Sequence, residues 1–142
     1  MKFLKEIDRE LYDMLQKFDK YVKIDEDDIV KELSKFSAIY GFFAVKLAKF
    51  QMLTEKAKFD LNRLQAELDS EYRQKFREEG TKVTEKMIES EIITDERYIE
   101  KQEFYQNLRE VFLVLQKAVD SLSTKKDMLI SLVSMKKVES TV

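Results

Sequence analysis

The side chains that could do chemistry in this chain are carboxylates, lysines, arginines, tyrosines and hydroxyls, because it contains no cysteine and no histidine. Thiolate catalysis, histidine-based triads, disulfides and zinc-finger sites are therefore excluded. The best carboxylate pairs are Glu100 with Glu103 and Glu85 with Glu89. They do not form the magnesium-binding pattern of helical nucleotide pyrophosphatases, and acidic residues at this spacing are common on solvated helix faces. We expect no enzymatic activity, no metal and no cofactor.

A second set of residues could bind a polyanion. Lys49, Lys56 and Arg63 recur every seven residues, so they would share one face of a helix. Such a stripe could follow a phosphate backbone, and Phe42, Phe59 or Tyr72 could stack an unpaired base. The alternative is a basic flank that keeps a coiled coil soluble and pairs with acidic neighbours. The candidate DNA-binding residues are Lys46, Lys49, Lys56, Lys58 and Arg63.

These basic residues lie on a stretch, 27–79, that predicts one long helix. Its apolar residues recur at alternating steps of four and three, and only a threonine and an alanine among them are less apolar. The positions are Ile29, Leu33, Phe36, Tyr40, Phe43, Leu47, Phe50, Thr54, Ala57, Leu61, Leu64 and Leu68. A seven-residue repeat of this length is typical of a left-handed coiled coil. A second apolar column occupies the far side: Ala38, Val45, Met52, Phe59 and Ala66. We therefore expect this helix to be covered on two sides by other helices or by neighbouring subunits, with a close crossing at Gly41.

The rest of the chain predicts further helices within a single domain, 1–142. An amphipathic helix should occupy residues 1–24, and the run Asp25 to Asp28 favours the start of the next helix over a calcium loop, which would need a glycine for its turn. Gly80 could end the long helix in a left-handed conformation. A short acidic helix over 81–93 and a C-terminal helix over 95–137 should follow.

The C-terminal helix is the expected site of self-association, because its end is densely apolar although it lies near a terminus. The candidate interface residues are Phe112, Leu115, Val119, Leu122, Met128, Leu129 and Leu132. Packing of this stretch on the first helix is the alternative. The predicted fold class is an all-α, elongated bundle of long helices or coiled coils that is oligomeric.

Composition agrees with this fold class and sets limits on location. The chain has no proline and two glycines, which leaves little material for turns or twisted sheets. The net charge is only −2, so overall charge favours neither nucleic acid nor membrane. The N-terminus lacks the features of a signal peptide, and no apolar run approaches the length of a membrane span. We expect a cytoplasmic protein without a membrane partner, in the host cytoplasm if a phage encodes it.

The order of these features resembles the UvsY-type recombination mediators of tailed phages. The run from Lys56 to Asp60 resembles a Lys-Ala-Arg-hydrophobic-Asp run in the basic helix of that family. The charged segment from Glu85 to Ile93 resembles the family's middle, and residues 104–132 resemble its aromatic and aliphatic C-terminal helix. The likeness covers roughly residues 45 to 135. The first helix and the run Asp25 to Asp28 have no counterpart, and the long helix continues where family members have a glycine-containing loop.

The resemblance implies a function and partners. Proteins of that family bind single-stranded DNA, form ring-like homo-oligomers through their C-terminal parts, and load a RecA-like recombinase onto strands covered by single-strand-binding protein. The resemblance points to Lys56 and Lys58 as DNA contacts, and the basic stripe extends them to Lys49 and Arg63. The alternative is a helical coiled-coil adaptor, chaperone or virion scaffold protein that does not bind DNA.

Overall fold

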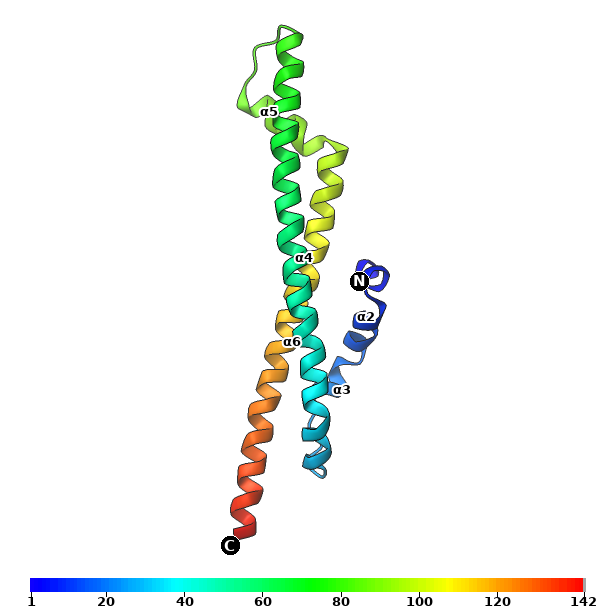
Figure 1. Ribbon diagram of the computed structural model, residues 1–142, viewed down its shortest axis with the longest axis vertical. Coiled ribbons are helices and arrows are strands. Elements are labelled where there is room, and N and C mark those ends of the chain that lie inside the picture. The colour runs from blue at the N-terminus through cyan, green and yellow to red at the C-terminus, as the bar shows by residue number, and fades with distance from the viewer. Residues whose placement is uncertain (142) are drawn as a thin grey trace. The chain divides into compact units, whose positions relative to one another are not determined.

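The computed structural model describes residues 1–141, and its regular structure over that range is entirely α-helical (Figure 1). The helices are α1 (Lys2–Ile7), α2 (Arg9–Gln16), α3 (Phe18–Val22), α4 (Ile29–Glu78), α5 (Glu85–Thr94) and α6 (Glu96–Thr141). The all-α class predicted from the sequence is confirmed. None of the helices in this range is both long and apolar enough to cross a membrane.

Both ends of α4 are set by side chains and turns that the sequence indicates. Asp28 caps the helix, because its Oδ1 accepts a hydrogen bond of 3.0 Å from the backbone N–H of Lys31. At the other end Gly80 has a φ of 72°. The backbone N–H groups of Gly80 and Thr81 donate to the carbonyls of Arg77 and Phe76, at 3.1 and 3.0 Å. This is the Schellman ending, in which a left-handed glycine closes the helix.

The N-terminal segment differs from the prediction of one helix over residues 1–24. It folds as α1, α2 and α3, with breaks at Asp8 and Lys17. Asp8 leaves the helical conformation, with φ −151° and ψ 87°, and its Oδ1 accepts from the backbone N–H of Leu11 at 3.0 Å. Aspartate competes for backbone N–H groups in this way, so it favours helix starts over helix interiors. The apolar spacing continues through Asp8, and for that reason periodicity alone missed the break.

Residue contacts divide the chain into two compact units. One unit comprises residues 1–49 with the part of α6 from residue 111 onward, and the other comprises Phe50–Glu110. Helices α4 and α6 contribute to both.

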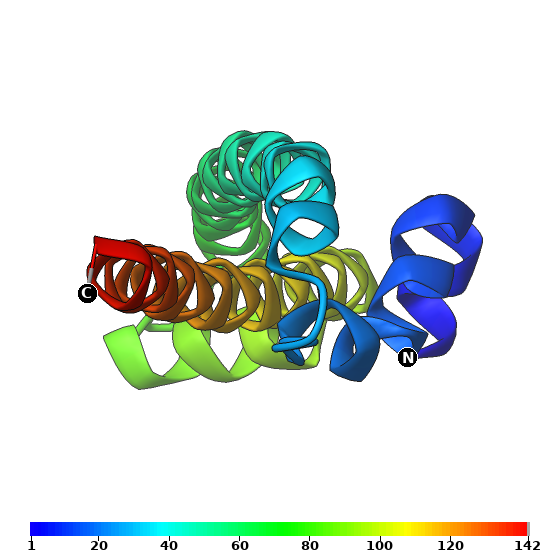
Figure 2. The same cartoon turned by 90° about the horizontal axis from the view of Figure 1, so that it is seen from below.

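The core of the first unit is formed by α4, α6 and the N-terminal segment. Phe43 is fully buried, with the rings of Phe18 and Tyr21 at centroid distances of 5.4 and 6.3 Å. The end of α3 and the connection to α4 lie next to the C-terminal part of α6. In the view from below, the connection crosses the ribbon of α6 (Figure 2). The Nζ atoms of Lys125 and Lys136 donate to backbone carbonyls in this region, those of Tyr21 at 2.6 Å and of Glu26 at 3.4 Å.

The second unit has an apolar cluster and a polar network. The buried residues Leu68, Ile88 and Ile92 pack α5 against α4. Beside them the Tyr72 hydroxyl donates to Asp95 Oδ2 at 2.6 Å. Arg97 binds both Asp95 and Glu71, with two bonds of 3.1 Å to Glu71. The hydrogen bonds from Arg97 and Tyr72 hold the pKa of Asp95 well below its usual range. The network fixes the start of α6 to α4.

The second apolar column of α4 is not covered by the residues that the structure describes. All five of its residues are exposed, and Phe59 is 66% exposed. A Cβ atom placed on Gly41 would have no neighbouring atom within 4 Å, so no part of the described chain makes the close crossing predicted there. Covering on two sides is therefore not provided by residues 1–141 of one chain.

The residues predicted to form a subunit interface fall into two groups. Leu115, Leu122 and Leu129 are buried in the chain's own core, so they are not available to a second subunit in this fold. Phe112, Val119 and Leu132 are half-buried, and Met128 is exposed. The last turns of α6 continue past the beginning of α4 (Figure 1). Self-association through this end stays a prediction for the second group.

Candidate nucleic-acid interface

Three exposed residues of α4 form the candidate interface: Lys56, Phe59 and Arg63. Their spacing of three and four places them on one face of the helix. No residue within the described range pairs with the Lys56 ammonium group. Phe42 and Tyr72, the other aromatic residues considered for base stacking, are half-buried, and Tyr72 is bound to Asp95. Phe59 is therefore the ring of the three that a base could reach.

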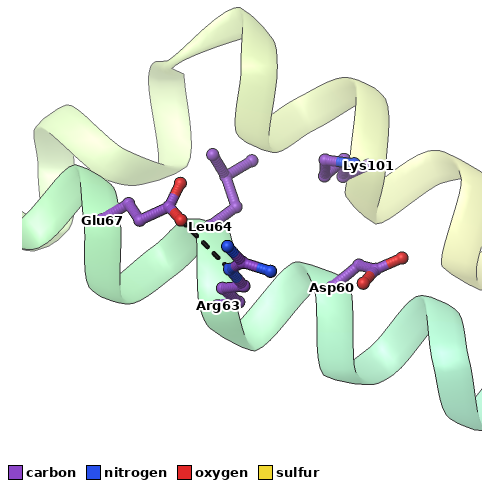
Figure 3. Close-up of a pocket in the computed structure, with 5 residues that line it drawn as sticks. All are labelled: Asp60, Arg63, Leu64, Glu67 and Lys101. Carbon is purple, nitrogen blue, oxygen red and sulfur yellow. Dashed lines mark hydrogen bonds and ion pairs between the residues drawn. The ribbon is translucent and has the colours of Figure 1, made fainter.

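Arg63 is paired, but only at the surface. Its Nε lies 3.3 Å from Glu67 Oε1, and both side chains are more than half exposed (Figure 3). An exposed pair at this spacing contributes about 0.3–0.5 kcal/mol, so a phosphate can compete with Glu67. The pair borders an open hollow of about 350 Å³ that Asp60, Leu64 and Lys101 also line. Lys101 comes from α6 and was not among the predicted contacts.

Lys58 occupies a different face. Residues two positions apart do not share a helix face, and the Lys58 Nζ lies 5.1 Å from the centroid of the Tyr105 ring of α6. A contact of this kind at an exposed site is worth about 0.5–1 kcal/mol. Lys58 therefore does not extend the surface formed by Lys56 and Arg63, although the sequence places it in the same basic run.

Lys46 and Lys49 are held by Asp8 of the N-terminal segment. Asp8 Oδ2 lies 2.7 Å from the Nζ of Lys46 and 3.9 Å from that of Lys49. Burial alone would raise the pKa of the Asp8 carboxyl, but the hydrogen bonds from Lys46 and the Leu11 N–H and the two lysine charges together lower it. The Lys46 side chain is only 17% exposed, so this predicted DNA contact is an internal ion pair in this conformation. Lys49 remains half-exposed.

Asp8 is the residue that sequence reasoning missed. Its carboxylate is 38 residues away from Lys46 in the chain, and no local pattern reports such a pairing. The available signal was its residue type, because an aspartate three residues before a buried leucine is a common helix cap.

One of the carboxylates considered for catalysis has a cationic partner. Glu85 binds Arg73 at 2.7 Å. Across the described residues no three acidic side chains come close enough to hold a metal ion.

Comparison with known proteins adds no relative, since neither the family models, nor the curated proteins, nor the solved structures contain a match to this chain.

Proposed function

We propose that the protein is a single-stranded-DNA-binding recombination mediator that helps to load a RecA-like recombinase onto strands covered by single-strand-binding protein. The observation that supports this best is the exposed set Lys56, Phe59 and Arg63 on one face of α4. Its cations face solvent with at most a weak surface pair, and an aromatic ring lies between them. The run Lys56 to Asp60, which resembles UvsY-type mediators, includes Lys56 and Phe59 of this set.

This combination suits an unpaired strand better than a duplex. Phosphates attract the two cations whatever the sequence of the strand, and an accessible ring can stack a base only when that base is unpaired. Stacking on an aromatic side chain contributes about 1–3 kcal/mol per base. Two cations and one ring are a weak site in a single chain, so the proposal requires several chains acting together.

Self-association would supply that multiplicity. Linked sites raise the effective concentration of each for the same strand, so that weak contacts add up to firm binding. The uncovered apolar residues Val45 and Met52 of α4 and Met128 of α6 support association with further copies. A ring-like homo-oligomer would hold the strand along several copies of α4 in a form that the recombinase can take over.

The test is a titration of a fluorescent oligothymidine with the wild-type protein and a Lys56→Ala, Arg63→Ala double variant. Each lost phosphate contact should reduce the slope of log affinity against log salt by about 0.7. A Lys86→Ala, Lys117→Ala variant is the matched control, because it removes two exposed basic charges elsewhere. Equal affinity and equal slope for the double variant and the control would remove the DNA role from this face. Circular dichroism and light scattering check that helicity and mass are unchanged.

A helical adaptor, chaperone or virion scaffold is the second candidate. The exposed apolar column of α4 favours it, because such a face suits a protein partner. A wild-type protein that does not bind the oligonucleotide even at low salt would decide for this alternative.

A further inference from the structure

We propose that the N-terminal strap, residues 1–24, is autoinhibitory: its Asp8 carboxylate occupies lysines of α4 that would otherwise contact DNA phosphates. The inference rests on the proposed DNA binding and adds a control element to it. It assigns a role to the part of the chain that has no counterpart in the mediators that the sequence resembles.

Asp8 binds these lysines as a phosphate oxygen would. Its Oδ2 accepts a hydrogen bond from Lys46 at 2.7 Å and lies 3.9 Å from Lys49, while its Oδ1 accepts from the Leu11 N–H. The Asp8 side chain is 7% exposed and that of Lys46 is 17% exposed, so the carboxylate is enclosed together with Lys46, while Lys49 stays half-exposed. Lys46 follows Phe42 and precedes Lys49 on α4, and Lys49 is one heptad before Lys56. Released lysines would therefore add two cations of α4 that phosphates could bind.

The strap is built to detach without unfolding α4. Helices α1, α2 and α3 have six, eight and five residues, well below the roughly 12–15 residues at which an isolated helix becomes even marginally stable. Their order therefore depends on contacts with the rest of the unit. Among these are the buried Leu4 and Leu11, the two rings against Phe43, the Tyr21 carbonyl that accepts from Lys125, and the Asp8 pair. Short helices that depend on such contacts can open locally at a fraction of the global free energy.

Strand and strap would then compete. A phosphate and the Asp8 carboxylate cannot both bind Lys46, so each bound strand shifts the strap towards the released state. Because such coupling is reciprocal, weakening the strap must strengthen DNA binding. A strap of this kind would keep the protein from coating DNA until several sites are engaged at once.

The experiment removes the charge of Asp8 and keeps the hydrogen bond by which this residue caps α2. Asparagine caps helices as well as aspartate does, so Asp8→Asn retains the bond to Leu11 and loses only the attraction to the lysines. Asp13→Asn is the matched control, because Asp13 is exposed on the same segment and forms a surface pair with Arg9 at 3.5 Å. Both variants change the net charge equally. The probe is the fluorescent oligothymidine at fixed salt.

We expect Asp8→Asn to bind the oligonucleotide about fivefold or more tightly than wild type, the lower end of typical coupling, and Asp13→Asn to bind like wild type. Adding Lys46→Ala to Asp8→Asn should abolish the gain. If the folded Asp8→Asn variant binds with wild-type affinity, the strap is not autoinhibitory and the proposed function still stands. Absence of binding in both wild type and Asp8→Asn overturns the proposed function itself.

Hydrogen exchange of the wild-type protein gives a second test that needs no variant. Saturating oligonucleotide should speed exchange across residues 1–22 and leave the buried part of α6 unchanged. Unchanged or slower exchange in the strap, in a protein that does bind the oligonucleotide, contradicts the competition.

Discussion

The Lys125 ammonium group lies 2.8 Å from the Glu32 carboxylate at a position where the α6 core is otherwise apolar. Buried residues of α6 recur at steps of four and three, and Lys125 is one of them at 4% exposure: Val111, Leu115, Ala118, Leu122, Lys125 and Leu129. The Nζ also donates to the Tyr21 carbonyl, and Glu32 accepts from the Asp25 N–H at 3.2 Å. A polar residue within such a repeat fixes the register of the helices.

Removing one partner of this pair should cost more than removing both. Glu32→Ala leaves a buried ammonium group without its counter-charge, and we expect a loss of about 3 kcal/mol in the free energy of unfolding. The double variant Glu32→Ala, Lys125→Met should regain most of it, because methionine fills the space without a charge. Urea unfolding followed by circular dichroism measures both. A double variant as unstable as the single one would show that the pair is not the cause.

Acid should destabilise the first unit through two carboxyls. The hydrogen bond from Lys125 holds the pKa of Glu32 below its ordinary value, and the pKa of Asp8 is lowered as well. Because folding lowers both pKa values, the stabilisation is fully present above the unfolded-state pKa of about 4. It is lost as the pH falls through the folded-state pKa.

The free energy of unfolding should therefore decline below about pH 5. Glu32→Gln should be less stable than wild type at neutral pH and should lose less on acidification. Parallel curves for the two proteins between neutral and acid pH would contradict this assignment.

The Tyr72 hydroxyl should ionise at a higher pH than an ordinary tyrosine. The hydrogen bond to Asp95 raises the pKa of its hydroxyl above the ordinary value of 10. A raised pKa stabilises the fold below about pH 10, and this contribution disappears as pH rises through the folded value. Spectrophotometric titration of tyrosinate should show a late step that Tyr72→Phe removes. Tyr98→Phe is the control. If the late step survives in Tyr72→Phe, another tyrosine is responsible for it.

The two glycines should respond to alanine in opposite directions. Gly41→Ala should stabilise α4 by about 0.5–1 kcal/mol, because nothing lies within 4 Å of the added Cβ. Gly80→Ala should destabilise by about 1 kcal/mol, because its φ of 72° disfavours a side chain. Thermal unfolding at low protein concentration tests both. If Gly41→Ala instead lowers stability together with the oligomer mass, a second chain crosses the helix at this glycine.

Phe59→Ala should weaken binding of single strands and leave stability unchanged, because the ring is largely exposed. Loss of one stacked base predicts at least about a fivefold drop in affinity. Val30→Ala, an exposed apolar residue at the start of α4, is the control. A duplex of the same length should not distinguish the variants, and an unchanged affinity for oligothymidine would exclude stacking on this ring.

The sequence by itself determined the helices whose signals are local. The seven-residue repeat predicted α4, and the acidic run and Gly80 predicted its two ends, because caps and turns depend on residues within one or two turns. The same periodicity could not tell whether other helices of the chain or neighbouring subunits cover the second apolar column, and residues 1–141 of one chain leave Phe59 and Val45 exposed.

Only the tertiary structure decided which of the charged side chains remain accessible to a ligand. Lys46, Lys56 and Lys58 look alike in the sequence, yet one is paired with Asp8, one faces solvent and one lies over Tyr105. Lys125 is a charged residue, yet it is buried against Glu32. These differences arise from contacts between residues far apart in the chain. A charge is stabilised by whatever lies within a few ångströms of it, and sequence spacing reports such neighbours only along a single helix.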